Sequence, residues 1–169
     1  MGLTHLPLRR AVGARRFGAL AMTAALAMAA CSRFEAPAPV VTPHVRVTQA
    51  PTVGEVDAIV RDALATAVAE KRTLVVYVGA GWCEPCQRFH RAAESGELDA
   101  TFPSLTMLEF DLDRDVQRLA AAGYASKYIP LFALPTQDGK ASGKQIAGAI
   151  KGEGAVAYIA PRLKELLAQ

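Results

Sequence analysis

Hydrophobic positions in the first half of the folded region alternate between two periods. Apolar residues recur at helical spacing from 56 to 68, and Thr52 and Glu55 before them have capping-box spacing, which predicts a helix that buries one stripe. The run TLVVYVGA (73–80) is almost continuously apolar and rich in β-branched residues, as is typical of a strand covered on both faces. A second helix is expected to begin around Cys83 and to fade near residue 95.

The second half of the chain continues this alternation. LTMLEFDL (105–112) predicts another strand, followed by a helix that Asp113 caps and that stops at Gly123. Strands are predicted at 131–134 and 144–150, and the final helix contains Pro161, which predicts a kink or a break. Helices and strands in this order predict an α/β fold with one central sheet flanked by helices.

The first 51 residues have a different character. Residues 1–30 carry four arginines and no acidic residue, and they end in FGALAMTAALAMAA, which predicts a signal peptide. Fourteen helical residues span roughly 21 Å, less than a bilayer core of about 30 Å, so a retained transmembrane helix is the weaker interpretation. Residues 31–51 contain four prolines and predict an extended tether in front of a folded domain at 52–169.

The net charge changes once this leader is considered. The whole chain has 19 basic and 16 acidic residues, but four of the basic residues lie in the leader, so cleavage before Cys31 leaves 15 basic and 16 acidic residues. The remaining chain has no excess of positive charge that would attract nucleic acid, and no basic run suited to anionic lipid headgroups. We therefore expect no nucleic-acid partner.

The segment YVGAGWCEPCQRFH (77–90) carries the chemistry. Cys83 follows a predicted strand and opens a helix, where free amides and the helix dipole stabilise a thiolate. Cys86 lies nearly one turn later on the same face, so it can attack a mixed disulfide formed by Cys83. Pro85 falls in the first helical turn, where its missing amide costs little. This arrangement favours dithiol exchange.

Other uses of the cysteine pair are weaker. Zinc usually needs four ligands; His90 could join the pair, but no fourth ligand is evident, so we expect no metal and interpret His90 as a solvated helix residue. A purely structural disulfide would close too short a loop to stabilise the fold much. The segment DLDRD (111–115) suggests calcium, but Val116 stands where an EF-hand loop needs glycine.

GWCEPC (81–86), followed by YIP (128–130), resembles the thioredoxin superfamily over about residues 53–169. The resemblance implies a thioredoxin-like fold with a mixed central sheet, and a cis Ile129–Pro130 bond beside the cysteines. It also implies that Cys83 attacks and Cys86 resolves, that Trp82, Glu84, Pro85 and Pro130 support them, and that no cofactor is needed.

One departure from the family concerns proton transfer. Members place a buried aspartate where this chain has Tyr77, and a lysine where it has Glu109. The proton acceptor of the resolving thiol is therefore left open between Glu109, Glu84 and water.

The sequence LAMAAC (26–31) resembles the lipobox of bacterial lipoproteins, which implies a lipid anchor on Cys31. The alternative is ordinary cleavage nearby, with Cys31 a spare thiol. With the lipobox, the expected protein is a periplasm-facing thiol–disulfide oxidoreductase of the bacterial cell envelope, held at a membrane and acting on protein thiols and disulfides. A reductase is favoured, and it would need an electron donor such as a membrane protein. The alternative is a non-catalytic binding or assembly module with the same fold.

Overall fold

The computed structural model describes residues 44–169, and in this region five strands form a mixed sheet. The strands are β1 (Arg46–Gln49), β2 (Thr73–Gly79), β3 (Leu105–Asp111), β4 (Leu131–Pro135) and β5 (Ala141–Ala147). Their order across the sheet is β1-β3-β2-β4-β5. Strands β1, β3 and β2 are parallel, whereas β4 runs antiparallel to β2 and β5 antiparallel to β4. The sheet is thus mixed, as predicted.

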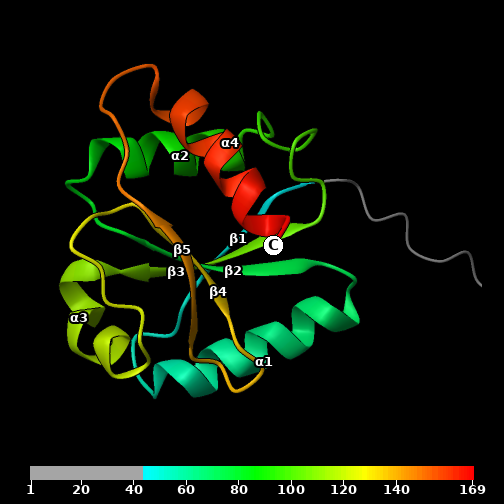
Figure 1. The fold of residues 1–169 in the computed structure, drawn as a ribbon, viewed down its shortest axis with the longest axis vertical. Coiled ribbons are helices and arrows are strands. Elements are labelled where there is room, and N and C mark those ends of the chain that lie inside the picture. The colour runs from blue at the N-terminus through cyan, green and yellow to red at the C-terminus, as the bar shows by residue number, and fades with distance from the viewer. Residues whose placement is uncertain (1–43) are drawn as a thin grey trace, which may run out of the picture. The chain divides into compact units, whose positions relative to one another are not determined.

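Helices cover both faces of this sheet (Figure 1). They are α1 (Val56–Ala69), α2 (Glu84–Glu94), α3 (Leu112–Ala121) and α4 (Ala155–Leu167). Along β2, Val75 and Tyr77 pack with residues of α2 and α4, whereas Val76 and its neighbours in the alternation pack with α1 and α3. Because successive strand residues point to opposite faces, a central strand covered on both sides has to be apolar throughout. The interpretation of TLVVYVGA is confirmed.

The first strand corrects the predicted boundary of the tether. Strand β1 lies inside the stretch 31–51 and pairs in parallel with residues 106–109 of β3. Val45 is fully buried; its amide donates to Asp99 at 2.8 Å, and Arg72 donates to the carbonyl of His44 at 2.6 Å. Residues 44–51 therefore belong to the folded unit, because they complete a sheet edge and fill part of the core.

Three predicted helix details also differ. Helix α1 begins at Val56, and its N-cap residue Glu55 makes no side-chain capping bond, so the capping box with Thr52 is absent. Helix α3 is capped by Asp111, whose carboxylate accepts the Arg114 amide at 3.0 Å, instead of by Asp113. The break predicted at Pro161 is absent: helix α4 continues through it, and the buried Ile159 and Leu163 on either side hold the helix to the core.

Candidate functional site

The two cysteines of the CxxC motif lie where β2 leads into α2. Cys83 is the N-cap residue of α2, and it forms a disulfide with Cys86, with 5.2 Å between the two Cα atoms. The amide of Cys86 donates to the Cys83 sulfur at 3.3 Å. The Cys83 sulfur thus occupies the position of a capping acceptor, at the positive end of the helix dipole.

This position separates the two sulfurs chemically. Cys83 and Cys86 are 4% and 3% exposed, so solvent access alone does not distinguish them. In the reduced protein, however, free amides at the helix start stabilise negative charge on Cys83. The division into an attacking Cys83 and a resolving Cys86 remains a prediction that rests on this difference.

The residues between the cysteines contact other parts of the chain. Pro85 is buried in the first turn of α2, where a backbone amide would have no partner within the helix, so its absence costs no hydrogen bond. The Glu84 carboxylate pairs with Arg88 and accepts the Gly152 amide at 3.1 Å. The hydrogen bond from Arg88, followed by the one from Gly152, lowers the pKa of Glu84. A carboxylate held in its ionised form in this way is a poor proton acceptor, so Glu84 serves to join α2 to the loop before α4.

Trp82 presents an exposed aromatic ring next to Cys83. Trp82 is 66% exposed, and its indole Nε1 donates to the carboxylate of Asp113 at 2.9 Å. Asp113 therefore orients this indole instead of capping α3. The ring is held in place while its face stays open to solvent, which suits contact with another polypeptide.

The Ile129–Pro130 bond is cis, as the resemblance implied. Leu131, the first residue of β4, pairs with Val78 near the end of antiparallel β2. This pairing places the cis bond beyond the end of β2, at the edge where the chain turns toward Cys83. Ile129 packs against the core cluster that contains both cysteines, and the Pro130 carbonyl accepts the Gly148 amide at 2.9 Å.

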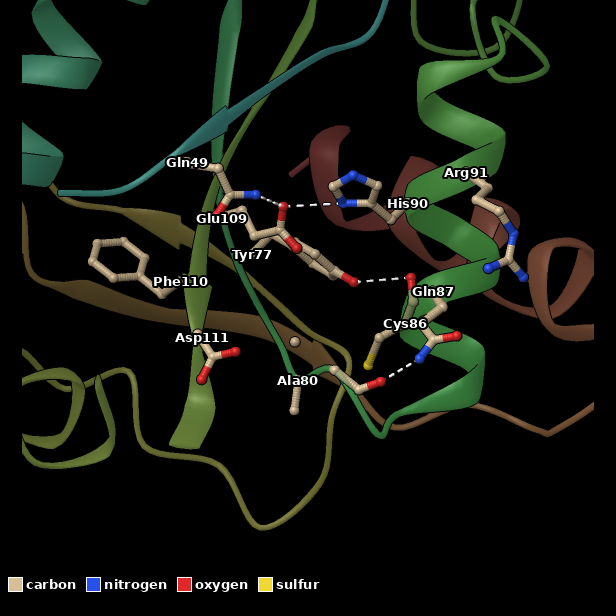
Figure 2. Close-up of a pocket in the computed structure, with 12 residues that line it drawn as sticks. Gln49, Tyr77, Ala80, Cys86, Gln87, His90, Arg91, Glu109, Phe110 and Asp111 are labelled. Atoms are coloured by element: carbon tan, nitrogen blue, oxygen red, sulfur yellow. Dashed lines mark hydrogen bonds and ion pairs between the residues drawn. The ribbon is translucent and has the colours of Figure 1, made fainter. Parts of the chain in front are cut away.

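A cavity of about 350 Å³ lies on the inner side of α2 (Figure 2). Cys86 and His90 line it from the helix, and three neighbouring strands close it from the sheet. The strand register sets Gln49, Glu109 and Tyr77 side by side on β1, β3 and β2. This row brings a carboxylate to the same hollow as the resolving cysteine.

His90 and Glu109 form the polar centre of this cavity. The Glu109 carboxylate lies 3.0 Å from His90 Nδ1 and also accepts a hydrogen bond from Gln49, while His90 Nε2 lies 3.0 Å from Glu94. The prediction that His90 is a solvated helix residue is therefore wrong, because its ring is only 25% exposed and engages a carboxylate on each side. Its position four residues after Cys86, on the same helix face, was the signal in the sequence.

Tyr77 closes the cavity beneath Cys86. Its hydroxyl donates to the Cys86 carbonyl at 3.2 Å. Burial, together with the nearby charge of Glu109, raises the pKa of Tyr77 far above its usual range. Tyr77 is therefore a neutral hydrogen-bond donor to the Cys86 carbonyl and not a proton acceptor.

The remaining predictions concern the leader, a membrane span and a metal site. Cys31 and the predicted signal peptide fall outside the described residues. Within residues 44–169, no helix combines the length and apolarity that crossing a membrane requires. The same range contains no group of three histidine, cysteine or acidic side chains arranged to hold a metal ion.

No protein-family model and no curated protein matches the chain. Solved structures do match it. Thioredoxin O1 from Arabidopsis thaliana in its oxidised state is 20% identical, with a TM-score of 0.45 over 75% of this chain and 96% of that one. Fasciola hepatica thioredoxin is 21% identical, with a TM-score of 0.46 over 73% and 96%, and a poplar thioredoxin h is 20% identical, with 0.44 over 75% and 98%.

The chain's own features define its thioredoxin-like α/β fold: the strand order β1-β3-β2-β4-β5, helices on both faces, a cis Ile129–Pro130 bond at the start of β4 and a cysteine pair at the start of α2.

Proposed function

We propose that this chain is a thiol–disulfide oxidoreductase that exchanges disulfides with partner proteins through Cys83 and Cys86. One observation carries the proposal: the Cys83 sulfur caps α2, accepts the Cys86 amide and is bonded to the Cys86 sulfur. A helix start activates a thiol as nucleophile, and a second thiol one turn later completes the exchange.

The reaction balances with these two residues alone. The reduced Cys83 thiolate attacks a partner disulfide, forms a mixed disulfide and releases one partner thiolate, which takes up a proton. Cys86 then loses its proton and attacks the Cys83 sulfur, and the second partner sulfur leaves as a thiolate. Two electrons pass from the dithiol to the partner, and the Cys83–Cys86 disulfide remains. No cofactor takes part in this sequence.

Exposed aromatic side chains support a polypeptide partner. Trp82 directly precedes Cys83, and Tyr128, which is 61% exposed, precedes the cis Ile129–Pro130 bond. Large aromatic residues are enriched where protein surfaces bind each other. We propose that Trp82 and the segment from Tyr128 to the buried Pro130 form the docking surface.

The proposed location is the periplasmic side of a bacterial envelope, with a lipid on Cys31 as the anchor. The support is the arginine-containing leader and the LAMAAC sequence. Intact mass of the membrane fraction should show acyl chains on Cys31, and Cys31→Ala should move the protein to the soluble fraction. An unmodified, soluble wild-type protein would contradict the anchor.

The direction of exchange is a separate proposal. We favour a reductase that draws its electrons from a membrane donor. Equilibration with glutathione measures the potential of the pair: a value near about −270 mV supports a reductase, whereas a value near about −120 mV supports an oxidant.

Trapping of the mixed disulfide tests the activity itself. Cys86→Ser removes the resolving thiol but leaves the helix-start position of Cys83 intact. Covalent complexes with partner proteins should accumulate in the native host, dissociate with dithiothreitol and disappear in the Cys83→Ser/Cys86→Ser protein. A non-catalytic binding module would form no cysteine-dependent complexes, and that result would overturn the proposal.

A further inference from the structure

We infer that Glu109 and His90 form a proton path from the Cys86 thiol to the surface of α2, with Glu109 as the group that receives the proton when Cys86 attacks. The inference rests on the proposed function and assigns further roles to residues on β3 and α2. It follows from the cavity behind Cys86 and from the contacts of its polar lining.

The path answers a chemical need of Cys86. This residue is 3% exposed, and a thiol attacks a disulfide only as the thiolate. Burial disfavours the charged thiolate, so a buried thiol gives up its proton most readily to a base close by. Cys86 lines the cavity on the inner side of α2, so a base that lines the same cavity can receive its proton.

The groups that face the cavity narrow the choice of base. Its titratable or charged side chains, apart from Cys86 itself, are Tyr77 from β2, Glu109 and Asp111 from β3, and His90 and Arg91 from α2. The Tyr77 hydroxyl donates to the Cys86 carbonyl, and the Asp111 carboxylate accepts the Arg114 amide as the cap of α3. Both contacts of the Glu109 carboxylate, with Gln49 and with His90, fall on Oε2, which leaves Oε1 to take a proton on the cavity side.

Open space connects Cys86 with Glu109. Gly79 leaves room at this point: a Cβ there would lie 3.0 Å from the Tyr77 hydroxyl and 3.4 Å from the Cys86 Cβ. The cavity volume of about 350 Å³ accommodates several water molecules, each of which occupies about 30 Å³ in the liquid. Its polar lining gives such waters hydrogen-bond partners, so a proton can move from the thiol to Glu109 through them.

From Glu109 the path continues outward along α2. The exposed fraction of the side chains rises from 16% at Glu109 to 25% at His90 and 60% at Glu94, and 3.0 Å contacts join each neighbouring pair. His90 can accept a proton at Nδ1 and release one at Nε2, because its two ring nitrogens face different carboxylates. Gln49 on β1 holds Glu109 in this arrangement through its amide.

The proposed step balances in protons and electrons. As the Cys86 sulfur bonds to the Cys83 sulfur, its proton passes to the Glu109 carboxylate and the bond between Cys83 and the partner breaks. The departing partner thiolate takes up a proton from solvent. Glu109 then returns its proton to solvent through His90 and Glu94, and the cavity is left with the charge it had before the step.

The test separates the two steps of exchange. Full-length proteins carry Cys31→Ser, so that Cys83 and Cys86 are the only thiols among the chain's three cysteines. The reduced protein is mixed with oxidised glutathione and quenched with acid, and mass spectrometry counts the glutathionylated intermediate and the disulfide product. Rates are measured from about pH 5 to about pH 9, the range in which thiols and imidazoles titrate. The variants are Glu109→Gln, Glu109→Asp and His90→Gln, with Glu165→Gln, an exposed carboxylate on α4, as the matched control.

Glu109→Gln should slow resolution by Cys86 at least about tenfold at neutral pH, so that the glutathionylated intermediate accumulates. Its rate should then rise about tenfold per pH unit, as for a thiol without a base, while attack by Cys83 stays within about twofold of wild type. His90→Gln should give a smaller slowing, Glu109→Asp should restore part of the rate, and Glu165→Gln should change neither step.

Resolution at the wild-type rate and with the wild-type pH profile in Glu109→Gln would overturn the inference. Equal slowing of both steps would overturn it too, because it would indicate a general loss of structure at the site. A wild-type protein that forms neither the intermediate nor the disulfide would overturn the proposed function instead, so the two failures are distinguishable.

Discussion

Gly139 has a backbone conformation that no other residue type accommodates at its position. It lies in the turn between β4 and β5 with φ at +83°, in the left-handed region, and its carbonyl accepts the Tyr124 hydroxyl at 2.9 Å. A Cβ at Gly139 would lie 1.9 Å from the carbonyl oxygen of Asp57 in α1. The turn thus rests directly on the backbone of a helix.

We expect Gly139→Ala to lower the free energy of unfolding by at least about 2 kcal/mol, because left-handed strain is added to a backbone clash. Gly143→Ala is the matched control, since Gly143 has the same φ of +83° but a Cβ there would meet no atom within 4 Å. Urea denaturation of both variants measures the difference. Equal losses of stability would show that strain alone, and not contact with α1, decides the outcome.

The site residues that sequence predicted are those whose chemistry is local. Cys83, Pro85 and Cys86 fall within one helical turn, and their roles follow from where α2 begins. Gln49 and His90 were missed because their partner, Glu109, lies 60 and 19 residues away along the chain and becomes a neighbour only through strand register and helix packing. The sequence identified Glu109 as a candidate proton acceptor, but not its contacts with Gln49 and His90.

At the scale of elements, a buried carboxylate joins α3 to its surroundings. Asp115 is fully buried, pairs with Arg114 and Arg118, and accepts the Asp111 amide at 3.1 Å. Arg118 in turn donates to carbonyls of the segment before α1, including that of Gly54 at 3.1 Å. Burial opposes ionisation of Asp115, but the hydrogen bonds and charges of the two arginines outweigh it and lower its pKa.

Asp115→Asn should therefore destabilise the protein by about 2 kcal/mol at neutral pH. A lowered folded-state pKa stabilises the fold fully above the unfolded value of about 3.9, and this contribution is lost as pH falls through the folded value. The difference between wild type and variant should shrink accordingly in acid. Denaturation at several pH values measures it, with the exposed Asp62→Asn as control; a difference independent of pH would contradict the role of charge.

The elements that sequence predicted well are long and periodic. The apolar run of β2 and the apolar stripe of α1 directly indicate which residues are buried. Strand β1, in contrast, is four residues long and largely exposed, and prolines lie on both sides of it. Its signal was the alternation around Val45 and Val47, which the prolines obscured. The cap predicted at Asp113 lies two residues earlier, at Asp111, because α3 begins at Leu112; Asp113 in the first turn accepts the Trp82 indole instead.

At the scale of the whole molecule, the sheet depends on its first strand. Val45 and Ala50 at the two ends of β1 are buried, and β3 loses its edge partner without them. A protein that begins at residue 52 should have a free energy of unfolding about 2–4 kcal/mol lower than one that begins at residue 40, from lost apolar burial. Thermal and urea denaturation compare the two; equal midpoints would show that β1 adds nothing to the fold.

Trp82 has an optical consequence. It is the chain's sole tryptophan, it adjoins Cys83, and its ring is held by Asp113 while remaining exposed. Indole emission is quenched by a neighbouring disulfide, so the protein carries an intrinsic reporter of its own redox state. Emission intensity on titration with thiols would follow reduction of the Cys83–Cys86 disulfide without any label. The same signal would report the binding of a partner polypeptide over the Trp82 ring.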